Sequence, residues 1–258
     1  MCHPARFYPC LVGAGAAGIL ATTVGWQYLF WLLACVGGGA SLWLYIKLPE
    51  TRWSGEQADD SVQGFFDGLP LLRHPKFLSH AGNWAFSSCI YFAFLAGAGF
   101  IVIEQMGRSE AEYGVYFSVA AICYIAGNFL SSQVAMRIGL LRCIQISSGI
   151  SLLATCFQWF LLEASHPFLV FLPMMIVAAA HGLVIPNAAA SVMDVMPRFA
   201  GAASGLAGFL QITAGAIVTA LVGYLQHQHD ITMVLAMSVC SVIAILFLFF
   251  VDLKRDDG

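Results

Sequence analysis

The strongest constraint on the fold is a succession of eight long apolar stretches that carry almost no charge. Each stretch is close to the ~20 residues that an α-helix needs to cross the hydrocarbon core of a bilayer. A membrane barrel would instead have alternating segments of about ten residues. The sequence therefore predicts an all-α, polytopic membrane helix bundle with about eight transmembrane helices, at residues 7–24, 26–48, 80–103, 113–136, 143–162, 168–193, 201–225 and 231–251.

The composition agrees with a membrane protein and excludes one class of partner. Hydrophobic residues make up 60% of the 258 residues and charged residues 10%, whereas a soluble domain is about 25% charged. The formal net charge is −3, so the chain has no basic field that would attract nucleic acid. We expect a lipid bilayer around the chain and no nucleic acid as partner.

No motif for a metal, a cofactor or an enzymatic reaction stands out. The eight cysteines lie singly, without a Cys-x-x-Cys pair, which gives no metal-ligand spacing. Residues 13–18 read GAGAAG and match the dinucleotide-binding fingerprint, but residues 31–46 contain no acidic residue that could hold the ribose. These glycines are better explained by close helix packing. We expect no metal, no cofactor and no enzymatic activity.

The distribution of Lys and Arg between alternate loops predicts the orientation, because these residues are retained on the cytoplasmic side. One side receives Arg108 alone. We therefore expect both termini in the cytoplasm and an even number of spans. The basic residues assigned to the cytoplasmic side are Arg6, Lys47, Arg52, Arg73, Lys76, Arg137, Arg142, Arg198, Lys254 and Arg255.

Polar residues in the sixth stretch form a stripe toward its cytoplasmic end. Asn187, Ser191 and Asp194 are spaced four and three residues apart, so they share one helix face. Asp194 could form an ion pair, carry a proton or be solvated at the interface, and the sequence favours the ion pair. Its candidate partners are Arg137, Arg142 and Arg198. His181 points about 120° away from this stripe, and a hydrogen-bonded packing role is favoured over proton transfer.

Polar and aromatic residues also repeat at helical spacing in the stretches 80–103 and 113–136, and Gln211 is a lone amide in the middle of 201–225. Each one alone could simply join two helices by a hydrogen bond. Several such stripes together favour a partly polar, aromatic-lined cavity suited to small amphipathic molecules. The candidate cavity residues are Asn83, Ser87, Tyr91, Tyr124, Asn128 and Gln211.

Several segments resemble a known transporter family. The segment WQYLFW at 26–31, followed by LPET at 48–51, is similar to the major facilitator superfamily. The segment GLVIPNA at 182–188, together with residues 193–211, resembles the Bcr/CflA-type drug:proton antiporters of that superfamily. Residues 77–94 and 137–142 are also similar to that subfamily, so the resemblance covers nearly the whole chain.

The resemblance implies an architecture of two half-bundles. A complete member has twelve helices in two halves around a central cavity, and this chain aligns to helices five to twelve, as an N-terminally truncated form. Residues 1–48 would then be the last two helices of the N-terminal half-bundle, 49–79 a cytoplasmic linker, and 80–258 the C-terminal six-helix half-bundle. The family's proton-coupling residues lie largely in the four absent helices.

The function implied by the resemblance is export of drug-like small molecules by proton antiport across the cell inner membrane. The ligands would be small amphipathic molecules and protons. Asp194 with Arg137 and Arg142 would form a cytoplasmic latch, and Asn187 belongs to the same gating or proton-linked group. A truncated membrane protein that does not transport, a facilitator-type metabolite transporter, and a partner that supplies the missing helices are the alternatives.

Overall fold

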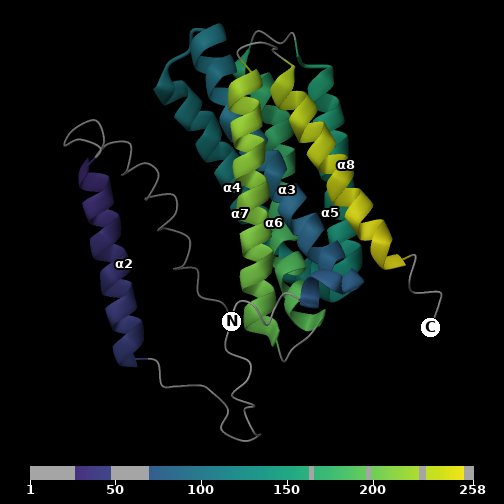
Figure 1. Cartoon of the computed structure of the whole chain (residues 1–258). Helices are drawn as coiled ribbons and strands as arrows, with labels where there is room; N and C mark the ends of the chain where they lie inside the picture. The colour runs from purple at the N-terminus through teal and green to yellow at the C-terminus, as the bar shows by residue number, and fades with distance from the viewer. Residues whose placement is uncertain (1–26, 48–69, 163–165, 196–198, 227–230, 253–258) are drawn as a thin grey trace, which may run out of the picture. The chain divides into compact units, whose positions relative to one another are not determined.

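The computed structural model describes residues 27–47, 70–162, 166–195, 199–226 and 231–252, and all the regular elements within these ranges are helices (Figure 1). The chain separates into two units, Met1–Ser61 and Val62–Gly258. The described element of the first unit is helix α2 (Gln27–Lys47). All the other elements belong to the second unit, which is described below by itself.

The second unit contains six helices that are long and apolar enough to cross a membrane. The first is α3 (Pro75–Gly99), which continues without a break into the π-helical turn η3 (Phe100–Gln105). The remaining five are α4 (Glu110–Ile138), α5 (Leu140–Trp159), α6 (Pro167–Val195), α7 (Ala200–Leu225) and α8 (Thr232–Asp252).

These helices confirm the all-α prediction, but not the full count of spans. Each of the six stretches expected after residue 80 is a helix, with ends that differ by a few residues from the predicted ones. The expected stretch 26–48 is the helix α2, which is not among the six candidate spans. The expected stretch 7–24 lies outside the described residues. The count of about eight transmembrane spans therefore remains a prediction.

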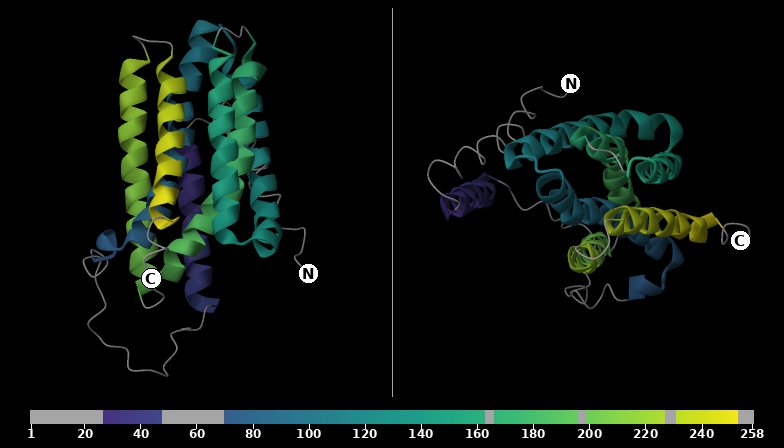
Figure 2. Two further views of the ribbon diagram at one scale, coloured as in Figure 1. Left: turned by 90° about the vertical axis from the view of Figure 1, so that its right-hand side faces the viewer. Right: turned by 90° about the horizontal axis from the view of Figure 1, so that it is seen from above.

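Helices α3 and α6 form the centre of the six-helix bundle. Helix α3 packs against α6, α7 and α8, and α6 packs against α4 and α5 as well. Figure 2, seen from above, shows the helices gathered around these two. Phe94 of α3 and Phe171 of α6 are fully buried and meet edge to face, with ring centroids 5.1 Å apart. Edge-to-face packing of this kind adds to the stabilisation from burial.

Glycines let α4 and α6 approach each other at backbone distance. A Cβ atom on Gly127 of α4 would lie 2.0 Å from the carbonyl oxygen of Ala179, and one on Gly182 of α6 would lie 2.3 Å from that of Tyr124. No side chain fits into either gap. Small residues of this kind allow close helix contact in membranes, where lipid gives little hydrophobic drive for helix association.

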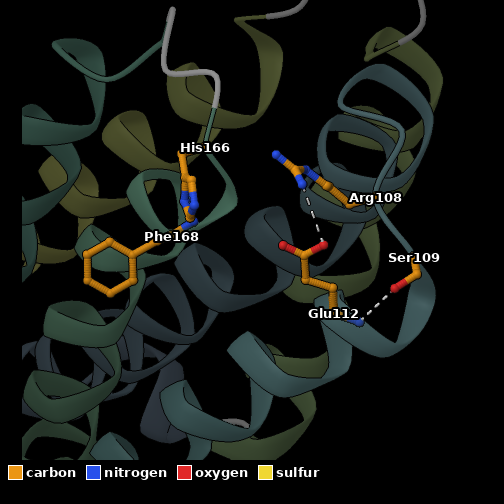
Figure 3. A network of polar contacts seen from close by, with 5 residues as sticks. All are labelled: Arg108, Ser109, Glu112, His166 and Phe168. Carbon is orange, nitrogen blue, oxygen red and sulfur yellow. Dashed lines mark hydrogen bonds and ion pairs between the residues drawn. The ribbon is translucent and has the colours of Figure 1, made fainter.

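The helix ends carry ordinary start and stop signals. Pro75 opens α3, where its missing N–H costs nothing. Ser109 caps α4 by accepting a hydrogen bond of 3.2 Å from the Glu112 backbone N–H, and Arg108 pairs with the Glu112 carboxylate at 4.0 Å (Figure 3). Both contacts favour the N-terminus of α4, because an acidic residue there complements the helix dipole.

Gly139 forms the turn between α4 and α5 and carries a testable consequence. Its φ is +88° and its ψ is 154°, a region that is essentially restricted to glycine. We expect Gly139→Ala to destabilise the bundle by about 1–3 kcal/mol. Gly149→Ala in α5 is the control, because nothing lies within 4 Å of its added Cβ; that change should be neutral or stabilising. Unfolding in SDS followed by circular dichroism measures both, and equal stabilities would contradict the prediction.

Candidate functional site

A cavity of about 310 Å³ lies within the six-helix unit and is lined by side chains from α3, α4, α6 and α7. Four aromatic side chains line it, two from α3 and two from α4. No Asp, Glu, Lys or Arg is among the described residues that line this cavity. The aromatic residues are Tyr91, Phe92, Phe117 and Tyr124.

The aromatic rings contact one another across the gap between α3 and α4. Tyr91 and Phe92 of α3 meet edge to face, with centroids 5.8 Å apart, and Tyr91 and Phe117 of α4 are 6.2 Å apart. All three side chains are half-buried. Their partial exposure leaves ring surface available to another molecule, which gives the cavity an apolar, π-rich wall.

A chain of hydrogen bonds fixes the polar part of the wall. The Gln211 side-chain amide of α7 donates to the Ser88 hydroxyl oxygen at 2.9 Å, and the Ser88 hydroxyl donates to the Trp84 carbonyl at 3.0 Å. Gln211 lies near the middle of the apolar helix α7 (Ala200–Leu225). The two bonds hold the amide in one orientation at the cavity and join α7 to α3.

His181 of α6 is a further polar residue at the cavity, and it has an unpaired atom. Its side chain is 2% exposed and lines the cavity from the middle of α6. The imidazole Nε2 is buried and has no hydrogen-bond partner among the described residues. Native structures pair the large majority of buried polar atoms, and this nitrogen is one of six buried side-chain atoms without a partner among the described residues.

The structure brings three of the six expected cavity residues to this cavity and places the other three elsewhere. Tyr91, Tyr124 and Gln211 line it. Asn83 is fully buried and donates to the Ser148 hydroxyl at 3.1 Å and to the Ala244 carbonyl at 2.9 Å, so it joins α3, α5 and α8. Ser87 is buried outside the cavity, and Asn128 is exposed on α4.

The polar stripe toward the C-terminal end of α6 also differs from the expectation. The Asn187 amide lies within hydrogen-bond distance of the Ser131 hydroxyl, at 3.0 Å, and of the Cys143 sulfur, at 3.2 Å, so it joins α6 to α4 and α5. Asp194 is exposed and forms no ion pair with Arg137 or Arg142. Within the described ranges the one ion pair is that between Arg108 and Glu112. The third expected partner, Arg198, lies outside the described residues.

Helical periodicity could have found Ser88 and Phe117, two of the lining residues that were not among the expected ones. Ser88 lies three residues before Tyr91, about 60° from it around the helix, so it belongs to the same side of α3. Phe117 lies seven residues before Tyr124, which returns it to the same side of α4. His181 carries no such signal, because it sits alone in an apolar run. Its place at the cavity follows from how α6 is turned within the bundle.

Comparison with known proteins identifies the family. The chain is 25% identical over 250 residues to the "Bicyclomycin resistance protein homolog" of Haemophilus influenzae, an alignment that covers 95% of this chain and 62% of the relative. It is 24% identical over 243 residues to the "Uncharacterized MFS-type transporter YdgK" of Bacillus subtilis, covering 93% and 60%. It is 24% identical over 233 residues to the "Multidrug resistance protein MdtL" of Escherichia fergusonii, covering 89% and 57%.

These comparisons confirm the similarity to the bicyclomycin- and multidrug-resistance members of the superfamily that the sequence motifs indicated. The chain spans about 60% of the length of these relatives. The profile of the Major Facilitator Superfamily matches residues 9–219, which is most of the chain. The protein is a multi-pass membrane protein of the transporter class, and it belongs to the Major Facilitator Superfamily.

Proposed function

We propose that the chain is part of a proton-coupled exporter of small amphipathic molecules. In this proposal residues 80–258 are the C-terminal half-bundle, 49–79 the cytoplasmic linker and 1–48 the last two helices of the other half. Two relatives carry names that refer to bicyclomycin resistance and multidrug resistance. Those names, and the span of about 60% of the relatives, motivate export as the activity of the longer assembly.

The cavity is the observation that carries the proposal. Tyr91, His181 and Gln211 lie in the middle part of three long apolar helices, which corresponds to the middle of the bilayer. Transporters commonly bind their substrates near this depth, between structural repeats. An apolar wall with a few convergent polar groups is also the usual composition of a small-molecule site.

The charges at the helix ends support a cytoplasmic location for one face of the bundle. Arg137 lies at the C-terminal end of α4, and Arg142 lies in the first turn of α5. Arg73 and Lys76 lie where α3 begins. Arg108 precedes α4 and so lies at the opposite end of that helix. This asymmetry fits the positive-inside rule. In this proposal the chain lies in the cell inner membrane, and the end of the bundle that carries Arg137 faces the cytoplasm.

Proton coupling in this proposal comes from residues outside the described cavity. The cavity has no carboxylate among its described lining residues, and Asp194 is exposed at the end of α6. A proton can drive export when protonation and substrate binding stabilise opposite-facing states. The carboxylate that this requires would lie in the part of the relatives that the chain does not span.

Substrate-dependent proton flux tests the proposal. Proteoliposomes would hold a pH-sensitive dye and either this chain alone or the chain fused to the N-terminal portion of the Haemophilus relative. We expect small aromatic amphiphiles to speed the collapse of an imposed pH gradient with the fused chain. Flux with the short chain alone would show that the described half-bundle has a sufficient proton site. Protein-free liposomes are the control, and no flux with either chain would contradict proton antiport.

A further inference from the structure

We infer that an anionic phospholipid binds at the turn between α4 and α5, with its phosphate on Arg137 and Arg142 and an acyl chain along the exposed face of α5. This site is separate from the cavity, and the inference goes beyond the proposed transport function. Three observations carry it: two exposed arginines without an ion-pair partner among the described residues, an apolar stripe that begins at one of them, and hydrogen bonds that hold this stripe outward.

The two arginines lie on either side of a one-residue turn. Helix α4 ends at Ile138 and α5 begins at Leu140, so Gly139 alone separates the two helices. Both arginines are exposed, and within the described ranges neither pairs with a carboxylate. A guanidinium group can bind two phosphate oxygens at once. A phosphodiester placed here would therefore supply the counter-charge that both side chains lack.

The exposed face of α5 is an apolar stripe that begins at Arg142. Its members follow Arg142 at spacings of four, four and three residues, which keeps them on one side of the helix. Leu153 is 71% exposed and, at 1.5 Å per residue, lies about 16 Å along the helix from Arg142. This length is close to half of the ~30 Å hydrocarbon core, which is one leaflet. The members are Ile146, Ile150 and Leu153.

Hydrogen bonds on the opposite face of α5 hold this stripe outward. The Ser148 hydroxyl accepts from the Asn83 amide of α3 at 3.1 Å, and the Thr155 hydroxyl donates to the Ser241 hydroxyl of α8 at 3.1 Å. Ser148 and Thr155 are both buried. Turning α5 about its axis would break these bonds and bring polar groups toward lipid, which is costly. The outward position of the stripe is therefore fixed by the packing of the bundle.

The side chains of the stripe suit a lipid chain better than another helix. Contacts between membrane helices are enriched in small residues, and α4 and α6 meet in this way at Gly127 and Gly182. The stripe instead presents the large branched side chains of Ile146, Ile150 and Leu153. A basic pair at the end of such a stripe matches an anionic headgroup at the membrane surface.

A second basic pair at the same end of the bundle lacks the apolar stripe. Arg73 and Lys76 are exposed where α3 begins. Ser79 and Asn83 lie three and seven residues after Lys76, on the same side of α3, and both are buried. Helix α3 packs against α6, α7 and α8, so this side of it offers no surface to an acyl chain. The pair therefore serves as the matched control for charge alone.

Native mass spectrometry of the full chain in detergent measures the binding of single lipids. The probes are dioleoyl phosphatidylglycerol, which is anionic, and dioleoyl phosphatidylcholine, which has the same acyl chains and no net charge. We expect the first anionic lipid to bind at least about 10-fold more tightly than the first neutral one. Arg137→Gln with Arg142→Gln should weaken phosphatidylglycerol by about 10-fold or more and leave phosphatidylcholine within about 2-fold, because each basic residue adds to the binding of an anionic headgroup.

Three further measurements separate a lipid site from a general charge effect. Arg73→Gln with Lys76→Gln removes the same number of charges and should leave phosphatidylglycerol within about 2-fold. Arg137→Lys with Arg142→Lys keeps the charge without the guanidinium fork and should weaken it by about 3-fold; this pair keeps the test decisive if the glutamine pair does not fold. A large excess of glycerol 3-phosphate, which has a phosphate but no acyl chain, should not displace the lipid.

Several outcomes would overturn the inference. Equal weakening by the two glutamine pairs would mean that the surface charge acts as a whole, and displacement by glycerol 3-phosphate would mean an anion site without a lipid chain. A dimer that Leu153→Asn dissociates would mean that a second copy of the chain covers the stripe. Equal binding of the two lipids by the unsubstituted chain would remove the site. None of these measurements uses a pH gradient, so their failure and a failure of proton antiport are distinguishable.

Discussion

Replacing Gly182 by alanine should destabilise the six-helix unit by at least about 3 kcal/mol, at the upper end of what overpacking costs. The added Cβ would lie 2.3 Å from the Tyr124 carbonyl oxygen and 2.5 Å from the Asn128 backbone nitrogen. Both neighbours are backbone atoms of α4, which cannot rotate out of the way as a side chain can. Helices α4 and α6 would have to separate along the surface where they pack.

The same contact predicts a coupling between two glycines. A Cβ on Gly127 would lie 2.0 Å from the Ala179 carbonyl oxygen, so Gly127→Ala should also force α4 away from α6. Once one substitution has separated the helices, the second should cost less. We therefore expect the double variant to be less destabilised than the sum of the single variants by at least about 1 kcal/mol.

The free energy of unfolding in SDS, followed by circular dichroism, measures the three variants. Gly114→Ala on α4 is the matched control, because its added Cβ meets nothing within 4 Å; it should be neutral or slightly stabilising, since alanine has the higher helix propensity. A Gly182→Ala protein as stable as the unsubstituted chain would contradict the close α4–α6 contact. Full additivity of the two glycine changes would contradict their coupling.

The six long helices could be predicted from the sequence because the bilayer imposes a simple length and composition rule. A run such as 168–193 must satisfy its backbone groups internally, whatever its neighbours are. The observed helix Pro167–Val195 differs from it by only a few residues. Pro173 and Pro186 lie inside this helix. Membrane helices tolerate such prolines, because neighbouring groups can satisfy the freed carbonyls, and here the hydropathy signal outweighs the helix-breaking one.

The candidate site was only partly predictable, because a polar stripe does not say what it faces. Asn83 and Tyr91 lie on the same expected face of α3, yet Asn83 pairs with Ser148 and Ala244 in the bundle interior, whereas Tyr91 reaches the cavity. In a membrane, a buried amide can be satisfied by a neighbouring helix as well as by a water-filled cavity. Which of the two occurs depends on how the helices are turned, and that is a property of the packing.

The charged residues show a similar limit. Asp194 and Arg142 lie at the same end of the bundle, as the loop pattern suggested, but both are exposed and they do not pair. Exposed ion pairs contribute little free energy, so packing of the helix ends decides whether such residues meet. His181 shows the opposite case, because burial makes it chemically distinctive although no motif in the sequence marks it.

Gly215→Ala should close part of the cavity and weaken the binding of a small aromatic probe such as 2-naphthol, a neutral two-ring compound, by about 10-fold or more. Gly215 is buried on α7, and an added Cβ would lie 2.5 Å from Cδ2 of Phe92. Phe92 lines the cavity and is half-buried, so its ring has room to move mainly toward the cavity. The displaced ring would then occupy space that the ligand needs. Stability should change little, because alanine favours the helix by up to about 1 kcal/mol over glycine and offsets the cost of the shifted ring.

A double-variant cycle separates this steric effect from a general one. In a Phe92→Ala background the ring is absent, so Gly215→Ala should no longer weaken 2-naphthol, apart from changes within about 2-fold. Gly208→Ala is the control on the same helix, since its added Cβ meets nothing within 4 Å, and it should bind the probe as the unsubstituted chain does. Equilibrium dialysis in nanodiscs measures the unsubstituted chain and all four variants. An equal loss from Gly215→Ala with and without the Phe92 ring would show that α7 itself shifts, because only the ring-mediated effect depends on Phe92.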